Sequence, residues 1–205
     1  MNELSLFLLP TSLTDLNEVY NIDASQLHPP LSSIKISSKI VDIHILPSTH
    51  DGTKLVYCVQ LFALIDEPKP ILDRDLERWL CDNRQLRGRP LKRARVAVRV
   101  NLFIRDKFQA AGLATYICKK EENYFRSWGA KEVQVFAMEM GRWVWTRPRF
   151  GYQVDAFEFK SAQLKYKEWQ RARGILPVVE ASRLSDFPKE FLLNEVNSLS
   201  LYKVL

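Results

Sequence analysis

The residues from Gln109 to Ala114 have the composition of a loop that binds phosphate groups. They read Gln-Ala-Ala-Gly-Leu-Ala and lie between a β-branched run, residues 96–104, and an amphipathic run, residues 113–129. In a strand, a tight loop and a helix in this order, the backbone N–H groups at the helix N-terminus point out towards a ligand. That N-terminus carries about half a positive charge. Gly112 has no Cβ, so an anion can approach its backbone closely. The Lys-Ser/Thr ending of a P-loop is missing, which argues against a nucleoside triphosphatase.

The composition argues against several other functional classes. The chain has 205 residues and a net charge of +6; its three cysteines form no CxxC pair and its three histidines form no HExxH motif, so no metal site is expected. An odd number of widely spaced cysteines indicates reduced thiols and a cytoplasmic protein. The apolar residues 4–10 lack the basic lead of a secretion signal. No apolar run reaches the ~20 residues of a membrane span.

The positive charge suits a polyphosphate ligand, an acidic peptide or nucleic acid. The densest basic run is residues 84–95, and it contains no aromatic side chain that could stack on a base. This basic run can be interpreted as a solvated surface loop or as a nucleic-acid-binding segment, and the second interpretation is the weaker.

Apolar periodicity and turn residues predict strands and helices before the loop. The expected elements are strands at 4–10, 39–46, 54–65 and 94–104, and helices at 13–20 and 72–81. Asp51-Gly52 predicts a hairpin turn between the second and third of these strands.

After the loop, the pattern alternates between helix and strand. The expected elements are helices at 113–128, 141–150, 161–173 and 188–197, and strands at 131–138, 153–160 and 199–205, the last at a sheet edge. The apolar face of the helix at 161–173 is weakly defined. Together the elements predict an α/β or α+β fold with a mixed sheet.

Residues 102–114, which read Leu-Phe-Ile-Arg-Asp-Lys-Phe-Gln-Ala-Ala-Gly-Leu-Ala, are similar to the pyrophosphate-binding motif of the GCN5-related N-acetyltransferases (GNAT superfamily). Proteins of that family carry Gln/Arg-x-x-Gly-x-Gly/Ala after their fourth strand. Residues 127–131, Ser-Trp-Gly-Ala-Lys, resemble the family's next connection. Residues 150–152, Phe-Gly-Tyr, resemble the Gly-Phe/Tyr after its fourth helix. The match covers residues 95–159.

The resemblance implies one GNAT-like domain over residues 1–205, with a mostly antiparallel sheet whose central strands splay apart and are flanked by helices. Its parts would be N-terminal strands, a helix and a hairpin (1–93), an acyl-CoA-binding core (94–160), and a helical insertion with a closing strand (161–205).

The resemblance also implies acyl-CoA as the acyl donor, with no metal. The backbone groups expected to pair with the pantetheine amides are those of Leu102, Phe103 and Ile104, and an N–H near Phe103 would stabilise the oxyanion. The backbone N–H groups expected to hold the pyrophosphate are those of Gln109, Ala110, Ala111, Gly112, Leu113 and Ala114.

The sequence departs from the family at two positions. Met140 and Arg147 stand where family members often have an Asn and a Tyr, and that Tyr commonly protonates the departing thiolate. Arg147 can stabilise a thiolate electrostatically, but a guanidinium is a poor proton donor. An Arg147 that faces a phosphate or solvent is an equal alternative.

Three residues are candidates for the base that deprotonates the acceptor amine. Glu139 follows the strand expected at 131–138, where the family's active site would lie, although it could instead cap the next helix. His44 and His50 lie on or beside the predicted hairpin, although a lone histidine is more often structural. Asp106 is expected to be a turn residue.

Two open features concern the acyl group and the acceptor. Trp143 and Trp145 fit either the core or a channel for an acyl chain longer than acetyl. The segment before the last strand could form an acyl pocket, a peptide groove or a homodimer contact. The expected function is transfer of an acetyl or longer acyl group to a primary amine, including a Lys or ornithine side chain of a peptide. The alternative is a GNAT-like protein that binds CoA or a peptide without catalysis.

Overall fold

The computed structural model describes all residues except 1–12, 51, 66–67, 88, 90 and 139, so the strand expected at 4–10 lies outside the described residues. The protein is of the α+β class and its strands pair mostly antiparallel, as the sequence predicts. The chain divides into two compact units. Unit 1 comprises Met1–Leu86, Leu91–Val133 and Leu205, and unit 2 comprises Arg87–Pro90 and Gln134–Val204.

Unit 1 contains an antiparallel sheet. Its strands are β1 (Lys35–Ser48), β2 (Gly52–Leu64), β3 (Pro68–Pro70), β4 (Leu76–Gln85) and β5 (Arg93–Arg99). The strand order is β1-β2-β4-β5, and β3 pairs with β2. The predicted hairpin is confirmed, because Ser48 pairs with Gly52 across the turn and Gly52 has a φ of 68°. Strand β1 extends beyond its expected bounds at both ends, whereas β2 begins before its expected start and ends at Leu64, just before its expected end.

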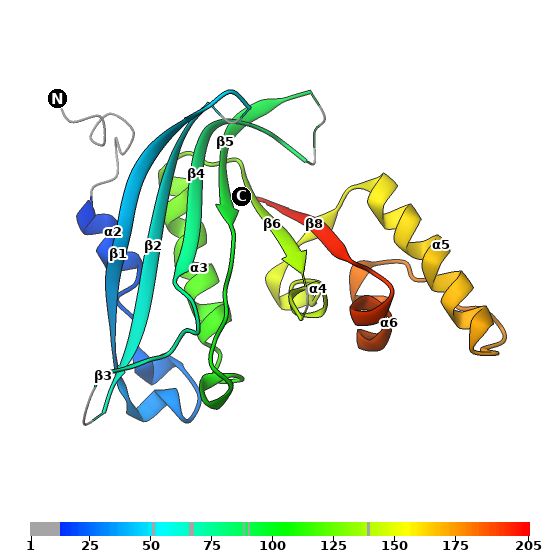
Figure 1. Ribbon diagram of the computed structural model, residues 1–205, viewed down its shortest axis with the longest axis horizontal. Coiled ribbons are helices and arrows are strands. Elements are labelled where there is room, and N and C mark those ends of the chain that lie inside the picture. Colours follow the sequence, from blue (N-terminus) through cyan, green and yellow to red (C-terminus); the bar gives the residue numbers. More distant parts are fainter. Residues whose placement is uncertain (1–12, 51, 66–67, 88, 90, 139) are drawn as a thin grey trace. The chain divides into compact units, whose positions relative to one another are not determined.

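Two helices cover one face of this sheet (Figure 1). They are α2 (Leu13–Val19) and α3 (Leu113–Ser127), and both lie where the sequence predicts a helix. Helix α3 ends at Ser127 with Trp128 as its C-cap, and Gly129 follows with a φ of 87°, the left-handed conformation of a glycine that ends a helix. Short 3-10 helices connect these elements: η1 (Ala24–Gln26), η2 (Leu31–Ser33) and η3 (Asp106–Phe108).

The sequence interpretation of unit 1 needs two corrections. Residues 76–85 form strand β4 rather than the helix expected at 72–81, because their buried and half-buried side chains alternate with a period of two at the start of the strand. Strand β5 ends at Arg99 rather than at residue 104. Residues 100–105 continue beside the loop after β3 with only an isolated bridge, between Leu72 and Ile104.

Unit 2 contains three helices, two 3-10 helices and three strands in the part of the chain that the structure describes. These are β6 (Glu132–Met138, which begins in unit 1), α4 (Gly141–Val144), η4 (Pro148–Phe150), β7 (Gln153–Val154), α5 (Ala156–Ala172), η5 (Leu184–Asp186), α6 (Lys189–Asn194) and β8 (Ser198–Val204). Tyr166, Trp169, Phe187 and Phe191 form an aromatic core with ring centroids 5.0–5.9 Å apart.

Three predictions in unit 2 are wrong. The strand expected at 153–160 stops after Val154, because Asp155 accepts a hydrogen bond from the Glu158 N–H (2.9 Å) and begins helix α5. The helix expected at 141–150 ends at Val144 and is followed by η4. Strand β8 lies between β6 and β7 rather than at an edge.

Candidate functional site

The extended segment 100–105 of unit 1 forms backbone hydrogen bonds with residues 71–77 along one of its edges. Val100 N–H donates to Glu77 O (3.1 Å), Asp73 N–H donates to Phe103 O (2.9 Å) and Arg105 N–H donates to Ile71 O (3.0 Å). Backbone groups of an extended chain point alternately to its two sides. Val100 is out of phase with Phe103 and Arg105, so the chain is irregular between residues 100 and 103. Counted from Phe103 and Arg105, the alternation places the N–H and C=O of Leu102 on the opposite edge, and neither has a hydrogen-bond partner among the described residues.

The loop that follows is held in a compact shape by its own residues. Gln109 donates from Nε2 to Ile104 O and to Asp106 Oδ1, both at 2.9 Å. Ala111 O accepts from His28 N–H, also at 2.9 Å. Ala110 has a φ of 61°, an uncommon conformation for a residue with a Cβ, and Gly112 has a φ of 81°. Asp106 lies in η3, so its predicted role in a turn is consistent with the structure.

The backbone N–H groups of residues 110–115 have no hydrogen-bond partner within the described chain. The ladder of helix α3 begins only with Tyr116, whose N–H donates to Gly112 O at 3.0 Å. These donors lie on a left-handed turn and at the N-terminus of a 15-residue helix, an arrangement that favours an anion. All residues expected to contact CoA, namely Leu102, Phe103, Ile104, Gln109, Ala110, Ala111, Gly112, Leu113 and Ala114, lie in this one strand–loop–helix segment.

Basic side chains flank the loop. Arg74 lies over the ring of Phe103 (5.1 Å from the guanidinium carbon to the ring centroid). The Arg105 guanidinium donates to Leu72 O (3.3 Å) and lies 3.5 Å from the Asp73 carboxylate. Lys107 extends from η3 and is exposed. The carboxylates of Asp73 and Asp106 lie among these cations and offset two of the three charges, so this part of unit 1 keeps a small net positive charge that would favour a polyphosphate.

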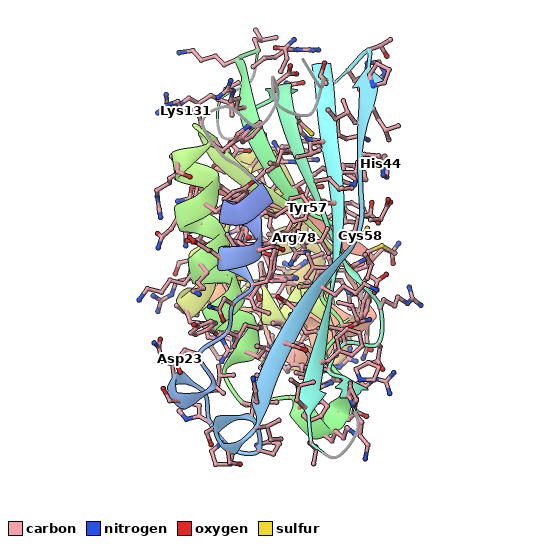
Figure 2. The ribbon with its side chains drawn as sticks, turned by 90° about the vertical axis from the view of Figure 1, so that its left-hand side faces the viewer. Asp23, His44, Tyr57, Cys58, Arg78 and Lys131 are labelled. Atoms are coloured by element: carbon pink, nitrogen blue, oxygen red, sulfur yellow. The ribbon has the colours of Figure 1, made fainter. Side chains whose placement is uncertain are left out.

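A buried ionic cluster contacts the extended segment 100–105 and helix α3. Arg78 donates from Nη1 to Asn101 O (2.6 Å) and from Nε to Glu121 Oε1 (2.8 Å), and Arg99 Nε donates to Glu121 Oε2 (2.7 Å). The Tyr20 hydroxyl also donates to Glu121, at 2.7 Å. Figure 2 shows Arg78 and Tyr57 on the side of the sheet that faces the helices. A single guanidinium thus joins the extended segment to helix α3.

Electrostatics in this cluster favour the ionised carboxylate. Burial alone would raise the pKa of Glu121, but the charges of Arg78 and Arg99 and the hydrogen bonds from Arg99 and Tyr20 lower it below its usual value. Burial and the charge of Glu121 raise the pKa of Tyr20, so the phenol stays neutral and its O–H donates a hydrogen bond to the carboxylate.

The opposite face of the sheet presents polar groups that the sequence interpretation missed. Glu77 pairs with Cys58 in the register of β4 and β2, and its carboxylate accepts a hydrogen bond from Trp79 Nε1 at 2.6 Å. Burial and the nearby charges of Glu77 and Asp42 raise the pKa of Cys58, so this thiol is a weak nucleophile at neutral pH. The order Leu-Glu-Arg-Trp-Leu over residues 76–80 has the alternation of a strand, and it could have predicted that Glu77 and Trp79 share one face.

His44 is on the same sheet but away from the loop. Its Nδ1 lies 2.9 Å from Asp42 Oδ2, and both side chains are well exposed. Figure 2 shows His44 and Cys58 on the side of the strands away from the helices. Strands β2 and β4 separate His44 from β5, a lateral distance of about 14 Å at usual strand spacing. His50 lies at the exposed hairpin turn, where its carbonyl accepts from Arg93 (2.9 Å).

The remaining candidates lie in unit 2 or outside the described residues. Glu139 is outside them. Arg147 donates to Trp143 O (3.1 Å) and to Thr146 Oγ1 (3.2 Å), and burial together with the charge of Arg149 lowers its pKa. Met140 precedes helix α4.

The two tryptophans of α4 and its C-cap differ in environment. Trp145 is buried against Phe150 and Tyr152, with ring centroids 4.8 and 5.6 Å away, so it belongs to the core of unit 2. Trp143 is half-buried, and the cations of Arg147 and Lys189 lie over its ring at 5.0 and 5.2 Å.

Comparison with protein-family models, with curated proteins and with solved structures finds no match to this chain. Among the described residues, no helix has the length and apolar character needed to cross a membrane. The same residues hold no group of three or more His, Cys, Asp and Glu side chains that could bind a metal ion.

Proposed function

We propose that this protein is a GNAT-like N-acyltransferase that uses acyl-CoA as its donor and a primary amine as its acceptor. The observation that carries the proposal is the unpaired row of backbone donors formed by Leu102 and residues 110–115 of unit 1. The first N–H groups of a helix have no partner within the helix, so together with the preceding left-handed turn they can donate to an anion. The ligand that matches it has an anionic end for the loop and an amide-bearing arm for the extended segment.

The parts of CoA would divide between the two halves of this row. The pyrophosphate would accept hydrogen bonds from residues 110–115, with Arg74, Arg105 and Lys107 supplying positive charge around it. A pantetheine amide would pair with the N–H and C=O of Leu102, as an added strand does at a sheet edge. The thioester would then lie beyond Leu102 towards Val100.

Glu77 is the proton acceptor best placed for this geometry. Its carbonyl accepts from Val100 N–H, so its backbone lies one strand away from the expected thioester, and its side chain is half-buried. An acceptor amine must lose a proton before or as it attacks the thioester carbonyl, and a carboxylate can receive that proton directly or through water. The amine nitrogen then bonds to the acyl carbon, the carbon–sulfur bond breaks, and the CoA thiolate leaves. Trp79 fixes the orientation of the Glu77 carboxylate.

Binding is tested by a thermal-shift titration with acetyl-CoA, palmitoyl-CoA and ATP. A ligand at about 100 times its Kd stabilises the protein by about 2.7 kcal/mol, which shifts the melting temperature measurably. We expect stabilisation by at least one acyl-CoA and a smaller effect of ATP. If neither acyl-CoA stabilises the protein, the proposal is wrong.

The variant Gly112→Asp localises the site. It places a Cβ and a negative charge among the unpaired N–H groups, so the shift with acyl-CoA should disappear. Gly174→Asp is the matched control, because Gly174 also has a positive φ (66°) but lies in unit 2 with no atom within 4 Å of a Cβ built there. Retained binding in the Gly112 variant would show that the loop does not hold the pyrophosphate.

Catalysis is tested separately from binding. Release of free thiol from acyl-CoA in the presence of amines such as lysine, ornithine and lysine-containing peptides would identify a transferase. Acyl-CoA binding without amine-dependent thiol release would identify the alternative, a non-catalytic CoA-binding protein.

A further inference from the structure

Helix α5 of unit 2 has large apolar side chains on its exposed side as well as on its buried side. Ala162, Tyr166 and Trp169 face the core of unit 2. Phe157 and Leu164 are 85% and 56% exposed. They are seven residues apart, so they lie on one line along the helix, and that line is opposite the buried residues. Nothing within the described part of unit 2 covers these two side chains to the extent expected of core residues.

The segment after α5 also carries exposed apolar side chains. Ile175, Leu176 and Val179 are 39%, 79% and 59% exposed. The segment runs back along the helix, because Gln170 exchanges two hydrogen bonds with the Val179 backbone, both at 2.8 Å. Gln163 also donates to Ala181 O at 2.6 Å. We call the exposed line of Phe157 and Leu164 the α5 apolar surface.

The charges beside the α5 apolar surface are mainly positive. Lys160, Lys165 and Arg171 are exposed, and none of them forms an ion pair with a described residue. Lys167 pairs with Glu180, and Arg173 pairs with Glu190 at 3.2 Å. Glu168 is the acidic residue of the exposed helix face that has no described ion pair. The exposed face therefore has three basic side chains against one acidic side chain.

We propose that the α5 apolar surface binds an anionic phospholipid membrane, with α5 lying in the plane of the interface. A helix that carries large apolar side chains and basic residues on one outward face has the composition of an interfacial helix. Phe157 and Leu164 would enter the boundary between headgroups and acyl chains. Lys160, Lys165 and Arg171 have long flexible stems, so their charged ends can reach anionic headgroups beside them.

Charge favours a lipid surface over a protein partner here. The apolar side chains are spaced along the helix between basic residues, and an apolar protein interface would normally exclude such charges from its centre. A membrane accommodates them, because each apolar side chain inserts independently while each cation stays at the headgroup level. This proposal concerns unit 2 alone and does not depend on acyl-CoA binding by unit 1.

The test is flotation of the full-length protein with two kinds of vesicle. One kind consists of phosphatidylcholine alone, and the other contains phosphatidylcholine mixed with phosphatidylglycerol. We expect binding to the anionic vesicles, much weaker binding to neutral vesicles, and loss of binding at high salt, since each basic residue near an anionic surface contributes about fivefold to partitioning.

Two sets of variants separate the apolar and charged contributions. Phe157→Ser with Leu164→Ser should reduce binding roughly tenfold or more, since both contacts with the acyl region are removed. Lys160→Gln, Lys165→Gln and Arg171→Gln together should reduce it about a hundredfold on anionic vesicles. The matched controls are Leu91→Ser, an apolar residue of unit 1 that is 95% exposed, and the combination Lys35→Gln, Lys39→Gln and Lys92→Gln. Neither control should change binding.

Three results would overturn the proposal. They are failure of the wild-type protein to float with anionic vesicles, equal binding to neutral vesicles, and undiminished binding of both variant sets. A wild-type dimer on gel filtration that becomes a monomer in Phe157→Ser with Leu164→Ser, without vesicle binding, would instead assign this surface to contact between copies. Circular dichroism of each variant checks that the fold is retained, as expected for substitutions at exposed positions.

Discussion

Replacement of Glu121 by glutamine should lower the free energy of unfolding by about 3–5 kcal/mol, the cost of breaking a buried ion pair from one side. Glu121 is completely buried and its carboxylate accepts from Tyr20, Arg78 and Arg99 at 2.7–2.8 Å. Glutamine preserves the volume but carries no charge. Its Nε2 would also face one of the arginine donors, so that a donor would meet a donor.

The magnitude follows from what remains after the substitution. Arg78 and Arg99 are 0% and 1% exposed, so neither guanidinium can regain water while unit 1 stays folded. The two buried guanidinium groups would then have no carboxylate between them. The remaining carboxylate is that of Glu122, 3.5 Å from Arg99. The loss is large for a domain whose total stability is about 5–15 kcal/mol.

Urea unfolding at neutral pH, followed by circular dichroism, measures the change. Glu18→Gln is the matched control, because Glu18 is an exposed glutamate of the same unit and should change stability by less than about 0.5 kcal/mol. A loss below about 1 kcal/mol for Glu121→Gln would refute the reasoning, because it would mean that the buried arginines do not need the carboxylate charge.

The same carboxylate predicts how stability depends on pH. The pKa of Glu121 in the folded protein is below its value in the unfolded chain, which is about 4.3 for a glutamate. Its contribution is therefore fully present above that unfolded pKa and is lost as the pH falls through the lower, folded pKa. Urea unfolding as a function of pH should show a steeper acid-side loss for the wild-type protein than for Glu121→Gln. Parallel pH profiles would contradict this assignment.

The remaining predictions concern four single residues. Tyr20→Phe removes one donor to a buried carboxylate and should cost about 1.5–3 kcal/mol in urea unfolding; no change would show that this hydrogen bond is dispensable. Asp155→Ala removes the N-cap of α5 and should cost about 1 kcal/mol, whereas Asp155→Asn should cost less. Glu77→Gln should reduce amine-dependent thiol release about 10²-fold or more while leaving the acyl-CoA thermal shift unchanged; an equal loss of binding would assign Glu77 to the donor site instead. Cys58 should react slowly with iodoacetamide at neutral pH and faster as the pH rises, because burial and nearby carboxylates raise its pKa; rapid reaction at neutral pH would contradict this.

Local signals predicted several elements correctly because each signal has a local cause. Gly52 needs a positive φ at the hairpin turn, and Gly129 needs one at the end of α3, so both marked boundaries that the structure confirms. The helix that follows Gly112 was also found, since its apolar stripe is a local signal, whereas the strand before the loop ends at Arg99, earlier than expected.

Other elements depended on tertiary contacts that a single sequence does not display. A helix was expected at 72–81, where the structure has strand β4. Arg78 of this strand is buried against Glu121, which lies 43 residues away in the chain, and a single sequence does not display that pairing. The weak face pattern of the helix expected at 161–173 has a related cause. Helix α5 has Phe157 and Leu164 on its exposed side, so its apolar residues do not form one stripe.

The bond from Arg78 to Asn101 O has a kinetic consequence. One guanidinium holds both the extended segment 100–105 that enters the loop and the helix α3 that leaves it, so the distance across the loop is set by a buried group rather than by a ligand. A preorganised site binds without the entropy cost of ordering its backbone. We therefore expect acyl-CoA to associate in a single phase whose rate rises in proportion to its concentration, without a slow rearrangement step. Arg78→Met should introduce such a step, although Arg78 makes no contact with the unpaired N–H groups of residues 110–115.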